Sequence, residues 1–241
     1  GTNEDVAVVR YNSNGSLDTT FGASGRITTD FSAGNDGARG ITLQSDGKIL
    51  LGGYAFNGTS FDFAVARYNT DGTLDTTFNG TGKVLVDIGT NSSDSGRSIF
   101  LQPDGRILVA GWSDAAGTND FALARLNANG SLDTSFNGTG KTTTTIGNGS
   151  DLGISVAVQA DGKILVVGQS NTAGNNFGVA RFNTNGSLDT TFNGTGKVDL
   201  NFGGSSDDRG QAVAVQADGR IVVAGTSTVN GSYDFAIARF N

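Results

Sequence analysis

The chain is a succession of short apolar runs separated by glycine-rich polar turns, and the same order of runs recurs along it. The most recognisable run, Asp-Phe-Ala-x-Ala-Arg, begins at Asp62, Asp120 and Asp234, with variants at Asp5 and Asn176, so the spacing is 56 to 58 residues. A fixed period of this size indicates units that bury their faces against one another. We therefore expect one repeat domain over residues 1–241, with repeats at about 5–61, 62–119, 120–175 and 176–233 and a partial copy at 234–241.

Each full period contains four strand signals, which are clearest around the second copy. Residues 40–44 form the first, and the Asp-Gly of the following turn at 45–47 favours a two-residue hairpin. Residues 49–53 are apolar at successive positions, which is typical of a strand buried on both faces. Residues 63–68 form the third signal. Residues 84–88 alternate apolar and polar positions, which suits a strand at a sheet edge facing water.

Four antiparallel strands per repeat, buried inside and polar at the rim, predict an all-β fold. The favoured architecture is a β-propeller of about four four-stranded antiparallel blades; a β-solenoid or an open propeller fragment is the alternative. The chain begins at the third strand of a unit and supplies five third strands but four of each other kind. We expect a last blade of C-terminal strands and the N-terminal fourth strand to close the ring. The surplus third strand is then free to complete a neighbouring molecule by strand addition.

Two long phrases carry a family resemblance. They are Ala-Arg-Tyr-Asn-Thr-Asp-Gly-Thr-Leu-Asp-Thr-Thr-Phe-Asn-Gly-Thr-Gly-Lys at 66–83 and Leu-Gln-Pro-Asp-Gly-Arg-Ile-Leu-Val-Ala-Gly at 101–111. They closely resemble the delta-60 repeat family, and the resemblance covers essentially the whole chain. It implies tandem propeller repeats of large secreted or surface-attached bacterial proteins, and no established activity or ligand. We therefore expect an extracellular or cell-surface location.

Composition excludes several classes of partner and site. With 16 Lys and Arg against 23 Asp and Glu, the net charge is −7, so we expect no binding to nucleic acid. No apolar run approaches the length of a membrane span, so we expect no membrane insertion. Cysteine and histidine are both absent, which excludes disulfides, thiolate zinc sites and the commonest general base.

Most charged residues recur at the same place in every repeat. Thirteen of the 16 cations occupy three repeated positions, and the acids behave alike. An enzyme needs an asymmetric group of converging residues, so we expect no enzyme, no catalytic residue and no cofactor. The third-strand arginine and the aspartate of the Leu-Asp-Thr phrase, Arg67 and Asp75 in one copy, are predicted to form a buried ion pair. A ring of arginines lining an anion channel is the alternative.

Two sets of residues are candidates for binding. Asn69, Asp71 and Asp75 place oxygen ligands at alternating positions beside a turn glycine, as in a calcium loop, although Asx turns explain the phrase equally well. Calcium is thus the one ion the sequence suggests. Trp112 and Tyr54 follow the second strand, where the other copies carry Gln and Thr. An exposed aromatic residue there would bind a sugar or a protein, and packing under a loop is the alternative.

The favoured function is a non-enzymatic extracellular structural or interaction module, adhesive or self-assembling through its surplus strand. Its partners would be proteins, by self-association or on another surface protein, or a glycan. The alternative is a carbohydrate- or calcium-binding propeller that uses the loops between the second and third strands. A carboxylate hydrolase is the third reading, for which the sequence offers no acid–base pair.

Overall fold

The computed structural model describes residues 3–32, 34–172 and 174–241, and this part of the chain forms seventeen strands in five antiparallel sheets. The described residues include no helix of the length and apolarity needed to cross a membrane. The strands are β1 (Val6–Val9), β2 (Arg26–Thr29), β3 (Asp36–Leu43), β4 (Ile49–Phe56), β5 (Phe61–Tyr68), β6 (Lys83–Val86), β7 (Asp94–Leu101), β8 (Ile107–Ser113), β9 (Asp120–Leu126), β10 (Lys141–Thr144), β11 (Leu152–Val158), β12 (Ile164–Asn171), β13 (Asn175–Phe182), β14 (Lys197–Leu200), β15 (Arg209–Val215), β16 (Ile221–Ser227) and β17 (Asp234–Phe240).

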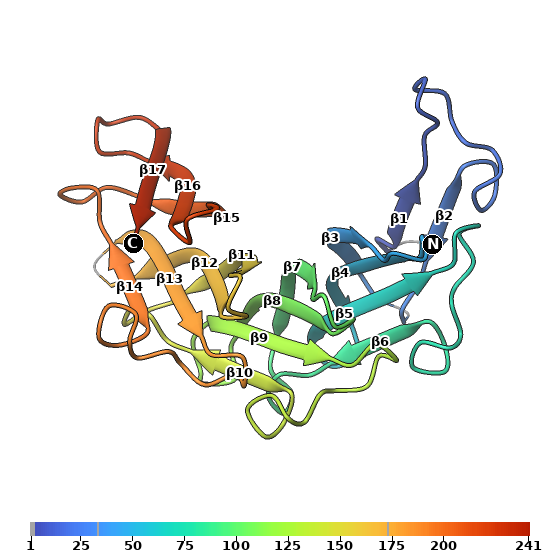
Figure 1. The fold of residues 1–241 in the computed structure, drawn as a ribbon, viewed down its shortest axis with the longest axis horizontal. Coiled ribbons are helices and arrows are strands. Elements are labelled where there is room, and N and C mark those ends of the chain that lie inside the picture. Colours follow the sequence, from blue (N-terminus) through green and yellow to red (C-terminus); the bar gives the residue numbers. More distant parts are fainter. Residues whose placement is uncertain (1–2, 33, 173) are drawn as a thin grey trace.

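Three sheets contain all four strands of the repeat, in the orders β3-β4-β5-β6, β7-β8-β9-β10 and β11-β12-β13-β14. The end sheets are shorter, with β1-β2 at one end and β15-β16-β17 at the other. Figure 1 shows the sheets following one another in an arc, with β3, β7, β11 and β15 along its concave side. The all-β, propeller-like prediction is therefore confirmed, in the form of its open alternative.

Ring closure by a shared blade is wrong. In the structure β2 pairs with β1 and β17 pairs with β16, so no sheet combines strands from the two ends of the chain. The two end sheets lie at opposite tips of the arc (Figure 1). The physical reason is that consecutive third and fourth strands pair with each other, which leaves no N-terminal strand available for β17.

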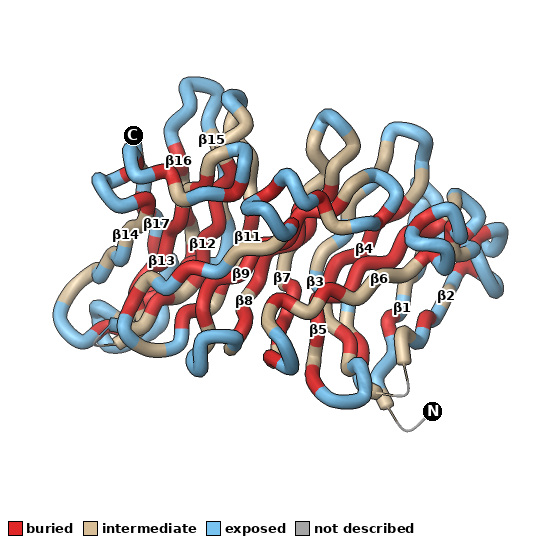
Figure 2. Tube along the Cα trace, turned by 90° about the horizontal axis from the view of Figure 1, so that it is seen from below, coloured by how far each residue is buried: buried red, intermediate tan, exposed pale blue. Residues whose placement is uncertain are grey.

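The second strand of each four-stranded sheet is buried on both faces, as the unbroken apolar runs predict. In the end sheet β16 is buried on one face and partly exposed on the other. Successive residues of β4 point to opposite faces, because side chains alternate along a strand. Leu50 therefore packs with Ile107 of the following sheet, whereas Ile49 and Leu51 pack with Val6 of the preceding one. Figure 2 shows this buried zone running from sheet to sheet, with exposed loops at the margins.

The hairpin between the first two strands is a three-residue loop, so the predicted two-residue hairpin is wrong. Gln44 N–H donates to Lys48 O at 2.8 Å and Gly47 N–H donates to Gln44 O at 2.9 Å. Of the loop residues only Gly47 has a positive φ, of 83°. This is the pattern of a type I turn followed by a left-handed glycine, and only the glycine needs the unusual backbone conformation.

An ion pair joins the third strand to the loop that follows it and recurs as predicted, buried in the central copies and partly exposed in the first. Arg67 Nε lies 2.7 Å from Asp75 Oδ2, and Lys48 Nζ lies 2.9 Å from the same oxygen. The equivalent pairs are Arg10–Asp18 at 2.8 Å, Arg125–Asp133 at 2.7 Å and Arg181–Asp189 at 2.7 Å.

The same arginine also reaches the next sheet. Arg67 Nη1 donates to Ala128 O at 2.6 Å, in the loop after β9, and its guanidinium lies 4.7 Å from the centre of the Phe78 ring. Arg125 repeats the contact by donating to Thr184 O at 2.5 Å. These arginines therefore bind protein groups and connect neighbouring sheets, as the structural interpretation of the pair predicts.

Burial raises the pKa of Asp75, but hydrogen bonds from Thr77 and Lys48 outweigh burial and hold the pKa well below its usual range. The pKa of Asp189 is lowered in the same way, by Thr191 and Lys163 against burial. The charged form of these carboxylates is therefore the one the fold stabilises.

Glycines allow neighbouring sheets to approach closely. A Cβ on Gly96 would lie 2.3 Å from Gly53 O, and a Cβ on Gly153 would lie 2.2 Å from Gly111 O. In both pairs the first glycine belongs to the first strand of one sheet and the carbonyl to the second strand of the sheet before it. No side chain fits at these contacts, because the obstacle is backbone.

We expect Asp75→Ala to lower the free energy of unfolding by about 3–5 kcal/mol, since the buried guanidinium of Arg67 is left without its partner. Urea unfolding monitored by circular dichroism measures the change. The control is Asp218→Ala, whose carboxylate is 49% exposed and pairs with Arg220 at the surface. That variant should lose less than about 1 kcal/mol. Equal losses in the two variants would show that the buried pair contributes no more to the free energy of unfolding than the surface pair.

Stability should fall as the pH falls below about 4, near the pKa of an aspartate in the unfolded chain. The sign follows from the lowered pKa values of Asp75 and Asp189, because protonation then favours the unfolded chain. The free energy of unfolding, measured from pH 7 to pH 2, should decrease less steeply in Asp75→Asn than in the wild type. Parallel curves would contradict this assignment.

We expect Gly153→Ala to destabilise the fold by about 1–3 kcal/mol, because its methyl group would collide with the Gly111 carbonyl of the preceding sheet. Gly149→Ala is the control, since its methyl group would first meet the flexible side chain of Asn171 at 2.9 Å. Thermal unfolding of both variants tests the contact. A similar midpoint for the two would show that the sheets are free to move apart.

Candidate functional site

A cavity of about 360 Å³ lies between the sheets β3–β6 and β7–β10. It combines aromatic rings with two cations, and none of its lining residues is acidic. The lining residues are Arg39 of β3, Tyr54 of β4, Phe61 of β5, Ser93, Ser95 and Arg97 at β7 and Trp112 of β8.

The two arginines enter the cavity because each sits at a β-bulge. The register of β3 against β4 shifts between Ala38 and Gly40, and that of β7 against β8 shifts between Gly96 and Ser98. Arg39 and Arg97 are the extra residues of these bulges. A bulge redirects a side chain without ending the strand, which places both cations on the same cavity.

The aromatic wall is built on the second and third strands of the earlier sheet. The Tyr54 and Phe61 rings meet edge to face, with centroids 5.6 Å apart. Tyr54 pairs with Gly37 across the sheet, and its ring occupies the space that a side chain at Gly37 would need. The Arg39 guanidinium lies 5.4 Å from the Tyr54 ring centre, and its Nη2 donates to the Tyr54 hydroxyl at 3.3 Å.

Two hydrogen-bond donors at this cavity have no partner. Trp112 Nε1 and Arg97 Nε are buried and make no hydrogen bond with the described protein atoms. A buried donor left unpaired costs about 1–3 kcal/mol. Burial, and then the positive charge of Arg39, lower the pKa of Arg97. A ligand that brings acceptor oxygens and negative charge would relieve both effects.

These residues mark where the repeat departs from its own pattern. The positions of Arg39 and Arg97 are occupied by Ile154 and Gln211 in the later copies. Those of Tyr54 and Trp112 are occupied there by Gln169 and Thr226. The cavity is therefore an asymmetric feature in a repetitive frame.

The structure brings together the two aromatic residues that the sequence singles out, since Tyr54 and Trp112 line the same cavity. It places Asn69, Asp71 and Asp75 elsewhere, in the turn after β5. Asp71 Oδ1 accepts from Thr73 N–H at 2.9 Å, and Asn69 Nδ2 donates to Thr73 Oγ1 at 3.0 Å. Asp75 is engaged by its two cations, so these oxygens have partners within the protein. Calcium at this turn stays a prediction.

Sequence reasoning missed Arg39, Arg97 and Phe61. A signal for the arginines was present, because three cations lie outside the thirteen repeated positions and two of them are Arg39 and Arg97. The third is Arg209, which pairs with Asp207 at 2.6 Å. What the sequence does not contain is the bulge geometry that turns both arginines toward one space.

A larger cavity of about 710 Å³ lies between the sheets β7–β10 and β11–β14. Its charged lining residues, Asp104, Arg106 and Arg125, belong to the repeated positions. Arg106 pairs with Asp104 and Asp133, and Arg125 pairs with Asp133. Its charges are thus neutralised within the protein, which distinguishes it from the cavity at Trp112.

Repeated antiparallel sheets stacked in an arc define a propeller-like repeat protein. The chain belongs to the family described as "Domain of unknown function (DUF5122) beta-propeller", which it matches over residues 1–21, 44–78, 102–136, 159–192 and 216–241. These segments contain the turn between the first two strands and the loop that follows the third.

No curated protein matches the chain. Among solved structures, it is similar to a protein of unknown function from Dyadobacter fermentans, with a TM-score of 0.51, 12% identity and coverage of 86% of this chain and 65% of that one. It is also similar to an endo-1,4-β-xylanase from Bacteroides thetaiotaomicron, with a TM-score of 0.47, 11% identity and coverage of 83% and 66%. A third is a polysaccharide lyase described as an ulvan lyase, with a TM-score of 0.47, 12% identity and coverage of 86% and 55%. The chain thus spans about two thirds or less of these proteins, and the first of them supports the fold alone.

The prediction of a non-enzymatic structural or adhesive module is corrected, because the reason given for it does not hold. The similar structures include proteins described as a xylanase, an endo-arabinase, an ulvan lyase and a gluconolactonase. The prediction excluded an enzyme because charged residues recur from repeat to repeat. That reason fails, since repetition in the frame does not prevent one junction from differing, as the cavity at Trp112 does.

Proposed function

We propose that the chain is a carbohydrate-binding propeller, and that its ligand is a sugar bearing a carboxylate or a sulfate. The observation that carries the proposal is the gathering of Arg39, Arg97, Tyr54 and Trp112, which break the repeat pattern, around one cavity. Carbohydrate binding is also the alternative that the sequence leaves open for these loops.

The chemistry of the lining fits both parts of an acidic sugar. Aromatic rings present flat apolar surfaces on which the C–H faces of a sugar ring can stack. Arginine binds carboxylate or sulfate oxygens through paired N–H groups. Arg97 Nε and Trp112 Nε1 supply donors that have no acceptor in the described part of the chain.

The net charge of −7 does not oppose this assignment. At physiological ionic strength, exposed charges beyond about 8 Å are largely screened, so the groups around the ligand decide its binding. The cavity lining contains two cations and no carboxylate. A single acidic sugar unit is therefore attracted locally.

We also infer from the phrases at 66–83 and 101–111 that the repeats are of the delta-60 type. An extracellular location agrees with that inference and with a polysaccharide ligand. Glycan from outside the cell would then reach the cavity directly.

Binding of polygalacturonate and of a sulfated dextran, with unmodified dextran for comparison, tests the proposal by isothermal titration calorimetry. The acidic polymers should bind and unmodified dextran should not. Arg97→Ile and Trp112→Gln introduce the types of residue that the third copy carries at the same places, so the sheet should accept them. Each should weaken binding about tenfold or more, since one charged hydrogen bond or one stacked ring contributes more than about 1.4 kcal/mol.

Arg220→Gln is the matched control, because it removes one positive charge from the surface outside the cavity. It should leave the affinity nearly unchanged. Equal losses in Arg220→Gln and Arg97→Ile would reduce the effect to net charge and contradict a site at Trp112. The proposal would also be contradicted if the protein bound unmodified dextran as tightly as the acidic polymers.

A further inference from the structure

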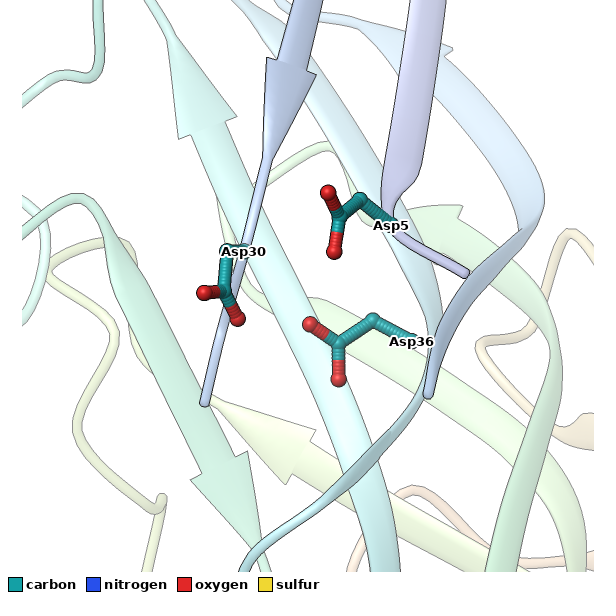
Figure 3. A group of neighbouring side chains, drawn as sticks. All are labelled: Asp5, Asp30 and Asp36. Atoms are coloured by element: carbon teal, nitrogen blue, oxygen red, sulfur yellow. The ribbon is translucent and has the colours of Figure 1, made fainter. Parts of the chain in front are cut away.

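Three carboxylates converge at the first junction between sheets. Asp5 precedes β1, Asp30 follows β2 and Asp36 opens β3. One carboxylate oxygen from each lies within 4.8 Å of the other two. Figure 3 shows the three side chains turned toward a common space.

The next junction repeats this arrangement with different residues. Asp62 lies in β5, Asp87 follows β6 and Asp94 opens β7 of the following sheet. Their oxygens also lie within 4.8 Å of one another. Each group thus combines one aspartate from the start of a third strand, one from the end of the following fourth strand and one from the start of the next sheet.

One oxygen in each group is buried without a hydrogen-bond partner, and this points to a cation. Asp36 is 2% exposed and Asp62 is 4% exposed, and Oδ1 of both lacks a donor in the described part of the protein. Their Oδ2 atoms are used, since Asp36 accepts from Phe31 N–H at 2.6 Å and Asp62 accepts from Asn57 Nδ2 at 2.8 Å. Each of these oxygens lacks the hydrogen-bond donor or the cation that a buried carboxylate needs, and a cation would serve all three carboxylates of its group at once.

The nearby lysines do not serve as that positive group. Lys83 Nζ donates to the backbone carbonyl of Asp30 at 2.6 Å, and Lys141 Nζ donates to that of Asp87 at 2.5 Å. Lys197 makes the same bond to the carbonyl of Thr145 at 2.9 Å, where no third carboxylate is present. The lysine therefore recognises a strand-end carbonyl. Within the described residues, the ion pairs of the protein include none of the six carboxylates.

The later junctions contain fewer carboxylates, two at the third and one at the fourth. The third places Thr145 between Asp120 and Asp151. The fourth carries Asn176 and Asn201 beside Asp208, and Asn201 Nδ2 donates to Asn176 Oδ1 at 2.9 Å. The amide pair carries no charge, although Asp208 Oδ1 has no partner among the described residues, as Asp120 Oδ1 has none at the third junction. What distinguishes the first two junctions is that three ionised carboxylates repel one another there, and a cation between them removes that repulsion.

We propose that Asp5, Asp30 and Asp36, and likewise Asp62, Asp87 and Asp94, form two equivalent calcium sites, each joining neighbouring sheets. Ligands of purely carboxylate type select a hard divalent cation. Calcium lies about 2.3–2.6 Å from its ligands, so two oxygens on one ion are at most about 5 Å apart, as they are here. Three carboxylates completed by water correspond to a weak site, with Kd about 10⁻⁴–10⁻³ M.

Equilibrium dialysis with radiolabelled calcium measures the number of sites. The wild type should bind two ions per chain at millimolar calcium. Asp62→Asn/Asp87→Asn should bind one ion, and the further addition of Asp5→Asn/Asp30→Asn should abolish binding. These substitutions reproduce the asparagines of the fourth junction and should therefore fold. Thermal unfolding supplies a second readout, since calcium should raise the midpoint of the wild type but not of the fourfold variant.

Asp120→Asn is the matched control, because it removes an equally buried carboxylate from a junction with only two. It should retain both ions. The proposal is overturned if the wild type binds no calcium, or if the fourfold variant binds as many ions as the wild type. The inference uses none of the residues that line the cavity at Trp112, so a failure of glycan binding leaves it standing.

Discussion

The stacked sheets depend on a charge that recurs in the repeats, is buried in the central ones and is shared between neighbours. An arginine of the third strand binds the aspartate of its own loop through Nε and a carbonyl of the next sheet through Nη1. Its planar fork makes this double contact possible, and lysine could not reproduce it. The pair thus fixes both the fold of one unit and the position of the following unit. Hydrophobic burial alone would hold the sheets together without specifying their alignment.

Glycines complement this ion pair on the concave side of the arc. The first strand of each sheet approaches the second strand of the preceding sheet closely enough for Gly96 and Gly153 to face backbone carbonyls. The approach brings the bulged residues of the first strands against the aromatic residues near the ends of the second strands. A junction can therefore carry a binding site only through a few positions, because the rest of its surface is occupied by the frame. Those few positions are the ones at which the copies differ.

The repeated frame was predictable from the sequence because each of its parts is local. The apolar run at 49–53 is a buried strand, and the spacing of Arg67 and Asp75 brings their side chains together within one hairpin unit. The open arc was not predictable, since strand counting allows an end-to-end pairing that the preference of β1 for β2 prevents. The aromatic residues of the cavity were predictable from the sequence, and its arginines were not. Tyr54 and Trp112 stand out as departures from the repeat, whereas Arg39 and Arg97 reach it only through bulges, which leave no mark in the periodicity.

Repetition and function are compatible here because the repeats are equivalent in fold and unequal in chemistry. The junction between β3–β6 and β7–β10 contains both the cationic aromatic cavity and one of the carboxylate groups. Two opposite charge clusters at one junction would destabilise a frame built only for packing, because each leaves buried polar atoms unpaired. At the fourth junction an amide pair replaces two of the carboxylates, and the two amides bond to each other while Asp208 Oδ1 stays without a partner among the described residues. Unpaired buried oxygens recur at Asp120 and Asp208, whereas the groups of three carboxylates and the cationic aromatic cavity belong to particular junctions. Ligands of opposite charge are the simplest physical means of satisfying these clusters.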